Sequence, residues 1–213
     1  MAGGKFISVS KPVVTINAKE LLRELTVDSP NQRRMGMALR AVIEPKIEER
    51  QKELQKQFKA HPITVELDAG PRASNTSGTL GGYGNLFSFI GFSSGDNPTD
   101  IISQVFSEKI KFKVRRVNKS GKYTVTFFIP DADQIYGLTP IPWMGGKSWA
   151  KSIEEGGLSN LGQYLFSRTG FDQSTSGTGI QVKNRSSGVS FTRTPYIGRL
   201  IEDFKKRLLR LDK

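Results

Sequence analysis

The chain has 213 residues, and its apolar content of 36% is enough for one sizeable core. It has no cysteine and a single histidine, which excludes disulfides and cysteine-ligated zinc and leaves few parts for a Ser-His-Asp triad or a transition-metal site. Lysine and arginine number 32 against 20 acidic residues, and the net charge of +12 indicates a polyanion or an acidic protein as partner.

The sequence shows no feature of export or membrane insertion. Its N-terminus lacks the apolar core of a signal peptide, and no apolar run approaches the roughly 20 residues that span a bilayer. We therefore expect a soluble, unexported chain that is made in a reducing cytoplasm.

The first 60 residues predict a strand followed by two helices. Phe6–Ile16 favours β structure, and Asn17 has the position of a cap for a short helix. Ser29 and Pro30 form a strong start signal for a long helix. Pro45 lies inside this helix, so we expect a kink that divides it into two segments. The apolar stripe of the long helix consists of Met35, Leu39, Ile43, Ile47, Leu54 and Phe58.

A short strand is predicted at Ile63–Leu67, and an unusual Gly-rich segment follows at about 70–97. Glycines in its first half give the backbone conformational freedom. Its second half carries a cluster of phenylalanines, and their apolar surface must be buried against other residues. One interpretation is a long arm that docks on a neighbouring subunit, and the alternative is an ordinary loop followed by a core strand. The candidate subunit-interface residues are Leu80, Tyr83, Leu86, Phe87, Phe89 and Phe92.

A helix is predicted from Asn97 to about Ser107, and the clearest hairpin of the chain follows it. Alternation in its first strand, and again in Tyr123–Ile129 after a turn at 118–121, is typical of half-buried strands. The adjacent Arg115 and Arg116 interrupt the pattern and suggest a bulge. The hairpin aromatics fall on the face opposite the lysines, which argues against a base-stacking platform. The cationic outer face consists of Lys111, Lys113 and Arg115.

The C-terminal third predicts two helices with less regular segments between them. A short helix is expected at Ser148–Glu155, a flexible loop at about 167–179, and a second small hairpin formed by Ile180–Lys183 and Val189–Thr192. The closing helix follows Pro195. Its apolar stripe consists of Ile197, Leu200, Ile201, Phe204, Leu208 and Leu211. Its basic residues, a second candidate contact for DNA or an acidic partner, are Lys205, Lys206, Arg207 and Arg210.

No catalytic motif is complete. Gly145–Ser148 imitates the end of a P-loop, but Ile141 stands where that motif needs its first glycine. Asp131 and Asp133 could begin a calcium loop, yet the next ligand position is apolar. His61 lies at a helix end, where a cation favours the helix dipole, and is interpreted as structural. We expect no enzyme, cofactor or metal, although paired carboxylates for hydrolytic chemistry are not excluded by sequence.

The order of the elements resembles the neck and tail-completion proteins of tailed bacteriophages. The likeness covers most of the chain in layout: a long early helix, ELDAGPRASNTSGTLGGYGNLFSFIGF, a basic hairpin, WMGGKSWAKSIEEGGLSNLGQYLF, SRTGFDQSTSGTGIQVK and a closing helix. Its specific part is an IEEG helix beside a tryptophan, followed by a Ser/Gly-rich loop and a hairpin. The Gly-rich arm is longer than the insertions of the compact tail-completion proteins.

This resemblance implies an antiparallel sheet flanked by helices, assembled as a ring between the head portal and the tail, with no catalytic residues. We therefore expect one α+β domain over residues 1–213, with hairpins, a long kinked N-terminal helix, a C-terminal helix and the Gly-rich arm. The expected role is a virion protein of the neck or tail joint that forms a sixfold or twelvefold homo-oligomeric ring. Its partners would be portal, neck or tail proteins and passing genomic DNA, with no membrane. The rival function is nonspecific binding of DNA or RNA by a monomer or dimer.

Overall fold

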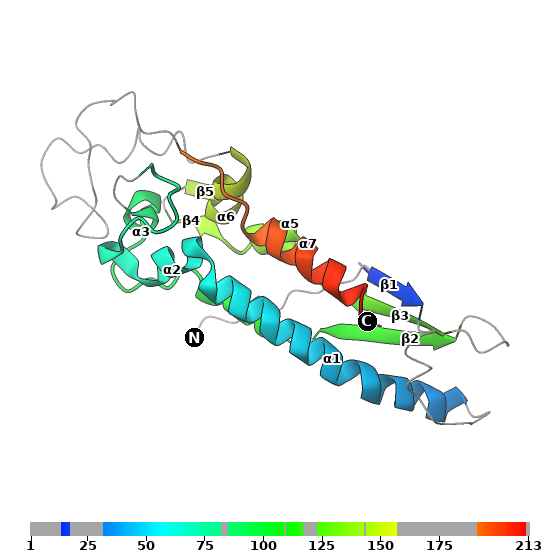
Figure 1. The fold of residues 1–213 in the computed structure, drawn as a ribbon. Coiled ribbons are helices and arrows are strands. Elements are labelled where there is room, and N and C mark those ends of the chain that lie inside the picture. The colour runs from blue at the N-terminus through cyan, green and yellow to red at the C-terminus, as the bar shows by residue number, and fades with distance from the viewer. Residues whose placement is uncertain are drawn as a thin grey trace, which may run out of the picture. The chain divides into compact units, whose positions relative to one another are not determined.

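The structure is a computed structural model that describes residues 14–17, 32–81, 85–108, 110–116, 123–142, 144–156 and 191–211. It contains a long N-terminal helix, two small antiparallel sheets and a C-terminal helix (Figure 1). The predicted combination of helices with antiparallel β-sheet is confirmed. The expected short helix after Asn17, the loop at 167–179 and the first strand of the second hairpin lie outside the described residues.

The chain divides into two compact units, each assembled from segments that are far apart in the sequence. Unit 1 comprises Met1–Gln55, Val105–Asp131 and Ile201–Lys213, and unit 2 comprises Lys56–Gln104 and Ala132–Leu200. Three helices contribute residues to both units: α1 (Gln32–Ala60), α4 (Asp100–Ser107) and α7 (Ile197–Leu208). Because of this sharing, the division does not test the predicted single domain.

Unit 1 contains a three-stranded antiparallel sheet in the order β1-β3-β2. Its strands are β1 (Val14–Asn17), β2 (Lys111–Arg116) and β3 (Tyr123–Phe128). The β2–β3 hairpin is the predicted one, because alternating Phe and Val side chains give each strand one apolar face. The predicted bulge at Arg115 and Arg116 is wrong, since the register runs without a shift from the Lys111–Phe128 pair to the Arg116–Tyr123 pair. The turn at 118–121 lies outside the described residues.

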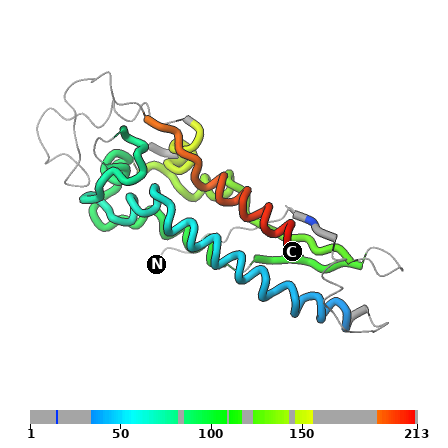
Figure 2. Tube along the Cα trace, viewed as in Figure 1, coloured from blue at the N-terminus to red at the C-terminus, as the bar shows by residue number. Residues whose placement is uncertain are grey.

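Helix α1 runs over 29 residues and passes through Pro45 without ending (Figure 2). The predicted division into two segments is therefore wrong. Pro45 is exposed, and the stripe on the opposite side of the helix stays continuous across it. The buried residues of this stripe are Leu39, Ile43, Ile47, Leu54 and Phe58.

Side chains of α1 also complete the end of α4 within unit 1. The Gln51 amide, which is 8% exposed, donates to the carbonyl of Phe106 at 2.8 Å and to that of Glu108 at 2.6 Å. Gln55 donates to the same Phe106 carbonyl at 3.0 Å. The last carbonyls of a helix have no partner inside it, and these amides supply hydrogen bonds at this helix end.

Both α4 and α7 form where the sequence predicts them. All six apolar positions expected in the closing helix are buried, including Leu211 just beyond its last turn. The short helix expected from Ser148 is also present, as α6 (Trp149–Lys151) followed by the π-helical turn η3 (Ser152–Gly156). Before it, β4 (Pro140–Ile141) and β5 (Met144–Ser148) pair as a small second sheet in unit 2.

The strand predicted at Ile63–Leu67 is wrong, because these residues form helix α2 (Pro62–Asp68). The Nδ1 atom of His61 accepts from the backbone N–H of Ile63 at 3.3 Å, and Pro62 occupies the first helical position. Both features favour a helix start. Apolar residues at alternate positions of a short segment fit a strand, while Ile63 and Leu67 also have the i, i+4 spacing of a helix face.

The Gly-rich segment contains the 3-10 turn η2 (Gly70–Arg72) and helix α3 (Leu86–Ile90). Asn85 caps α3 by accepting from the backbone N–H of Ser88 at 2.9 Å. Gly91 ends the helix in the left-handed region with φ of 88°, a conformation that other residues rarely adopt. The apolar half of the segment is thus a core element, as in the alternative that the sequence left open, although it is a helix and not a strand.

Candidate polyanion-binding face

One face of the unit 1 sheet is polar and cationic, and we call it the basic sheet face. The Arg40 guanidinium of α1 lies 5.1 Å from the centroid of the Phe112 ring, which places the apolar side of β2 toward α1. Since side chains alternate along a strand, the neighbours of Phe112 point to the opposite face. The residues of the basic sheet face are Lys111, Lys113, Arg115, Thr15, Thr124, Thr126 and Phe128.

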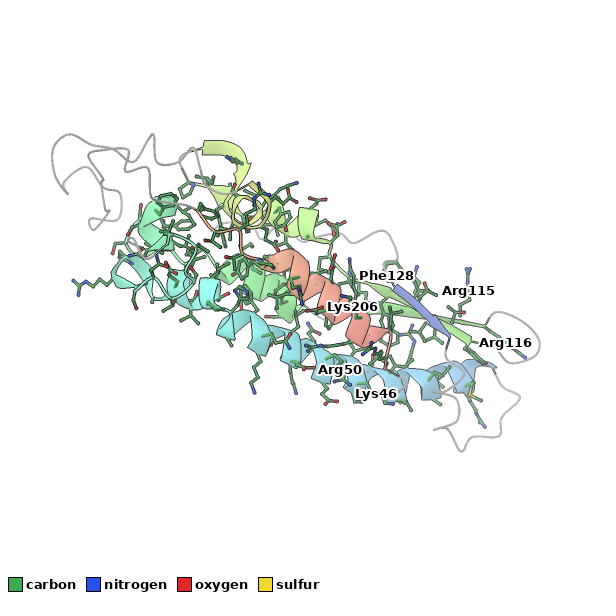
Figure 3. The ribbon with its side chains drawn as sticks, turned by 45° about the horizontal axis from the view of Figure 1, so that its top comes forward. Lys46, Arg50, Arg115, Arg116, Phe128 and Lys206 are labelled. Atoms are coloured by element: carbon green, nitrogen blue, oxygen red, sulfur yellow. The ribbon has the colours of Figure 1, made fainter. Side chains whose placement is uncertain are left out.

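The three cations of this face are exposed, as the sequence predicts. None of the residues in β1, β2 or β3 is acidic, and no acidic side chain in the described part of the chain forms an ion pair with Lys111, Lys113 or Arg115. Figure 3 shows Arg115 and Phe128 on the sheet. The positive charge here is consequently available to a partner.

Hydroxyl groups and one aromatic ring lie among these cations. Thr15 and Thr126 face each other across β1 and β3, with their hydroxyl oxygens 3.5 Å apart. The Lys113 ammonium lies 5.3 Å from the centroid of the half-buried Phe128 ring. The prediction that the hairpin aromatics lie on the other face is wrong for Phe128, which pairs directly with Lys111.

The basic residues of α7 have a different environment. The Arg207 guanidinium is 2.6 Å from a carboxylate oxygen of Glu53 in α1, and its side chain is only 31% exposed. Lys206 pairs with Asp203 at 3.5 Å but remains 65% exposed, whereas Lys205 is half-buried and Arg210 is exposed. Figure 3 shows Lys206 on α7, with Lys46 and Arg50 on α1. Arg207 thus serves packing within unit 1, and the two basic sets predicted from the sequence are not equivalent.

Unit 2 contains a polar cluster around Glu154 that the sequence did not reveal. The Glu154 carboxylate accepts from the backbone N–H of Tyr196 at 2.7 Å and from that of Gly198 at 3.1 and 3.0 Å. The Tyr136 hydroxyl also donates to this carboxylate. A Cβ atom at Gly198 would lie 3.3 Å from a Glu154 oxygen, which is a tight contact, so glycine favours the close approach. With both oxygens accepting, Glu154 acts as the cap of α7.

The ionisable neighbours of Glu154 are held in their neutral forms. Burial, followed by the hydrogen bond to Glu154, raises the pKa of Tyr136 well above its usual value. Burial likewise raises the pKa of Tyr196, whose hydroxyl lies 2.8 Å from that of Thr64. Burial lowers the pKa of His61, against a smaller opposite effect of its hydrogen bond to the Pro195 carbonyl and of the Glu154 charge. His61 thus caps α2 as an acceptor, and its lowered pKa disfavours the cationic form that the sequence interpretation assumed.

A second carboxylate, Glu66 of α2, is fully buried and has a similar role. One of its oxygens accepts from the backbone N–H of Ser77 at 2.9 Å, and the other accepts from that of Leu86 at 2.7 Å. Glu66 therefore fixes the Gly-rich segment and the start of α3 to α2. No sequence pattern distinguishes Glu66 from a surface carboxylate, because its partners are backbone groups that are distant in sequence.

The predicted subunit-interface residues are mostly buried in unit 2. Leu80, Leu86 and Phe87 are at most 1% exposed and Phe92 is 5% exposed, so each contacts its own chain. Phe89 is half-buried, and Tyr83 lies outside the described residues. Of the described members of this set, Phe89 alone offers appreciable surface to a neighbour, and its role in a subunit interface stays a prediction.

The remaining features of the described residues give no site for a metal or a small molecule. A pocket of about 60 Å³ in unit 1 is lined by Gln51, Glu108, Lys111, Phe128 and apolar neighbours. This volume suits a few waters and is far below the several hundred Å³ of typical small-molecule sites. No cluster of three metal-ligating side chains occurs in the described ranges, and none of the helices described there has the length and apolarity to cross a bilayer.

No protein-family model, curated protein or solved structure matches the chain. The basic sheet face and the internal hydrogen bonds of Glu66 and Glu154 are therefore the features that bear on function.

Proposed function

We propose that this protein is a structural component of the neck or tail joint of a tailed bacteriophage. It would assemble as a homo-oligomeric ring, sixfold or twelvefold, against portal, neck or tail proteins in the virion. The basic sheet face carries this proposal. Its three exposed cations form no ion pair with an acidic side chain of the described residues, which suits a contact surface for an acidic neighbour or for passing genomic DNA.

The buried carboxylates support the same conclusion. Glu66 and Glu154 direct both of their oxygens to backbone N–H groups, so their hydrogen-bonding capacity is used for holding segments in place. A general base must lie within hydrogen-bond reach of a substrate, and Glu66 is fully buried. These side chains thus serve a mechanical protein better than a hydrolytic enzyme.

Native mass spectrometry of the nuclease-treated protein over a concentration series tests the proposal. We expect a closed ring, either at all concentrations or forming from monomer as the concentration rises. Phe89→Asp should weaken assembly, since it puts a charge on the half-buried member of the predicted interface. Val65→Asp on α2, at a side chain 43% exposed, should leave assembly unchanged. A strict monomer at every concentration would contradict the proposal.

A further inference from the structure

We propose that the basic sheet face binds the phosphodiester backbone of duplex DNA. This inference deepens the proposed function, because it names the partner of the basic sheet face. Failure of duplex binding and failure of ring assembly are distinguished by anisotropy and by native mass spectrometry. Three observations carry it: the geometry of the cation row, the groups that surround the row, and the contrast with α7.

The cations of β2 form a row with regular backbone spacing. Residues two apart on a strand are separated by about 6.6 Å, so Lys111, Lys113 and Arg115 present three charges over about 13 Å. Duplex DNA carries one phosphate charge per about 1.7 Å of helix axis when both strands are counted, so a row of this length faces several phosphates. The three long cationic side chains can therefore each reach a different phosphate of one duplex.

The neighbouring groups favour backbone contact over base contact. The hydroxyls of Thr15, Thr124 and Thr126 lie on the same face and are among the groups that donate to phosphate oxygens. The Lys113 ammonium lies over the Phe128 ring, which leaves that ring poorly placed to stack on an unpaired base. We therefore assign the surface to the duplex and not to a single strand.

The α7 set supplies a matched control. Lys111→Gln/Lys113→Gln/Arg115→Gln and Lys205→Gln/Lys206→Gln/Arg210→Gln each remove three positive charges, which takes the net charge from +12 to +9. The comparison separates a localised contact from a general effect of charge. Arg207 is left intact in both variants because it pairs with Glu53.

The experiment measures the affinity for a fluorescent DNA duplex by anisotropy, over a range of salt concentrations, for the nuclease-treated protein. Each lost phosphate contact reduces the magnitude of the slope of log K against log salt by about 0.9. The slope should therefore be about 2.7 smaller in magnitude for the variant of Lys111, Lys113 and Arg115, and almost unchanged for the α7 variant. Native mass spectrometry of both variants checks that the oligomeric state is unchanged.

Several outcomes would overturn the inference: equal slope losses in the two variants, a loss confined to the α7 variant, or no duplex binding by the wild-type protein beside binding to polyglutamate. Tighter binding of a single strand than of the duplex, with about tenfold loss of single-strand affinity in Phe128→Leu, would overturn the assignment to the duplex.

The lysines of β2 have a second possible role, because lysines on an edge strand discourage edge-to-edge association. Lys113→Glu keeps a charge there, so it should stay monodisperse in light scattering while its duplex affinity falls.

Discussion

Single side chains in unit 2 satisfy backbone groups that no neighbouring helix turn or strand reaches. Glu66 binds two N–H groups from the Gly-rich segment, and Glu154 binds those of Tyr196 and Gly198 at the start of α7. An unpaired buried N–H costs free energy comparable to a lost hydrogen bond. These carboxylates are therefore expected to matter for stability more than any ion pair of the surface.

Glu66→Gln tests this expectation with a change that preserves volume. The variant keeps one oxygen, so one of the two N–H groups would face the new amide nitrogen, and the free energy of unfolding should fall by about 1 to 3 kcal/mol. Urea denaturation measures it. Glu155→Gln makes the same change at a side chain 58% exposed, and should shift stability by less than about 0.5 kcal/mol. Equal effects of the two changes would contradict the structural role of Glu66.

His61 gives stability a specific pH dependence. Burial lowers its folded-state pKa below the usual 6.5, so between these values the unfolded chain binds a proton that the folded chain does not. Stability should consequently fall as the pH drops below about 6.5. His61→Asn keeps an N-cap acceptor for Ile63 but does not titrate. In urea denaturation from pH 7.5 to pH 5, the wild type should lose stability relative to His61→Asn, and parallel curves would contradict this.

The secondary-structure elements show which sequence patterns are sufficient by themselves to predict a helix or a strand. The β2–β3 hairpin, α4 and α7 could be predicted because their apolar periodicity and their start signals agree. Helix α2 could not, since its seven residues fit both periods and the choice depends on the cap at His61. The burial of α3 depends on contacts with residues distant in sequence, so the exposed arm and the core element had equal support from the sequence alone.

The effect of Pro45 on helix α1 differs from the predicted one. It removes one backbone donor from α1, yet the helix continues through it and its buried stripe is unbroken. Because Pro45 is exposed, Pro45→Ala should restore the hydrogen bond without disturbing the core and raise the free energy of unfolding by about 1 to 3 kcal/mol. Chemical denaturation measures the change. A loss of stability would instead show that packing requires the geometry imposed by proline.

For the molecule as a whole, the net charge can be predicted from the sequence, whereas the distribution of charge over the surface can be predicted only in part. The net charge of +12 and the cationic face of β2 follow from composition and alternation. The pairing of Arg207 with Glu53, and the place of Phe128 among the lysines, depend on tertiary contacts and strand register. The two interleaved units are not visible in the sequence, because each joins segments that are separated along the chain by parts of the other unit.

This interleaved division has a consequence for synthesis on the ribosome. Unit 2 buries Tyr196, and unit 1 buries Phe204 and Leu208, so neither core can be completed before α7 has been translated. At 5 to 20 residues per second, the apolar stripe of α1 would wait about 7 to 30 seconds after its own synthesis for the residues of α7. The nascent chain is therefore a natural client for chaperones that shield apolar surface, and its yield in a host should depend on their supply.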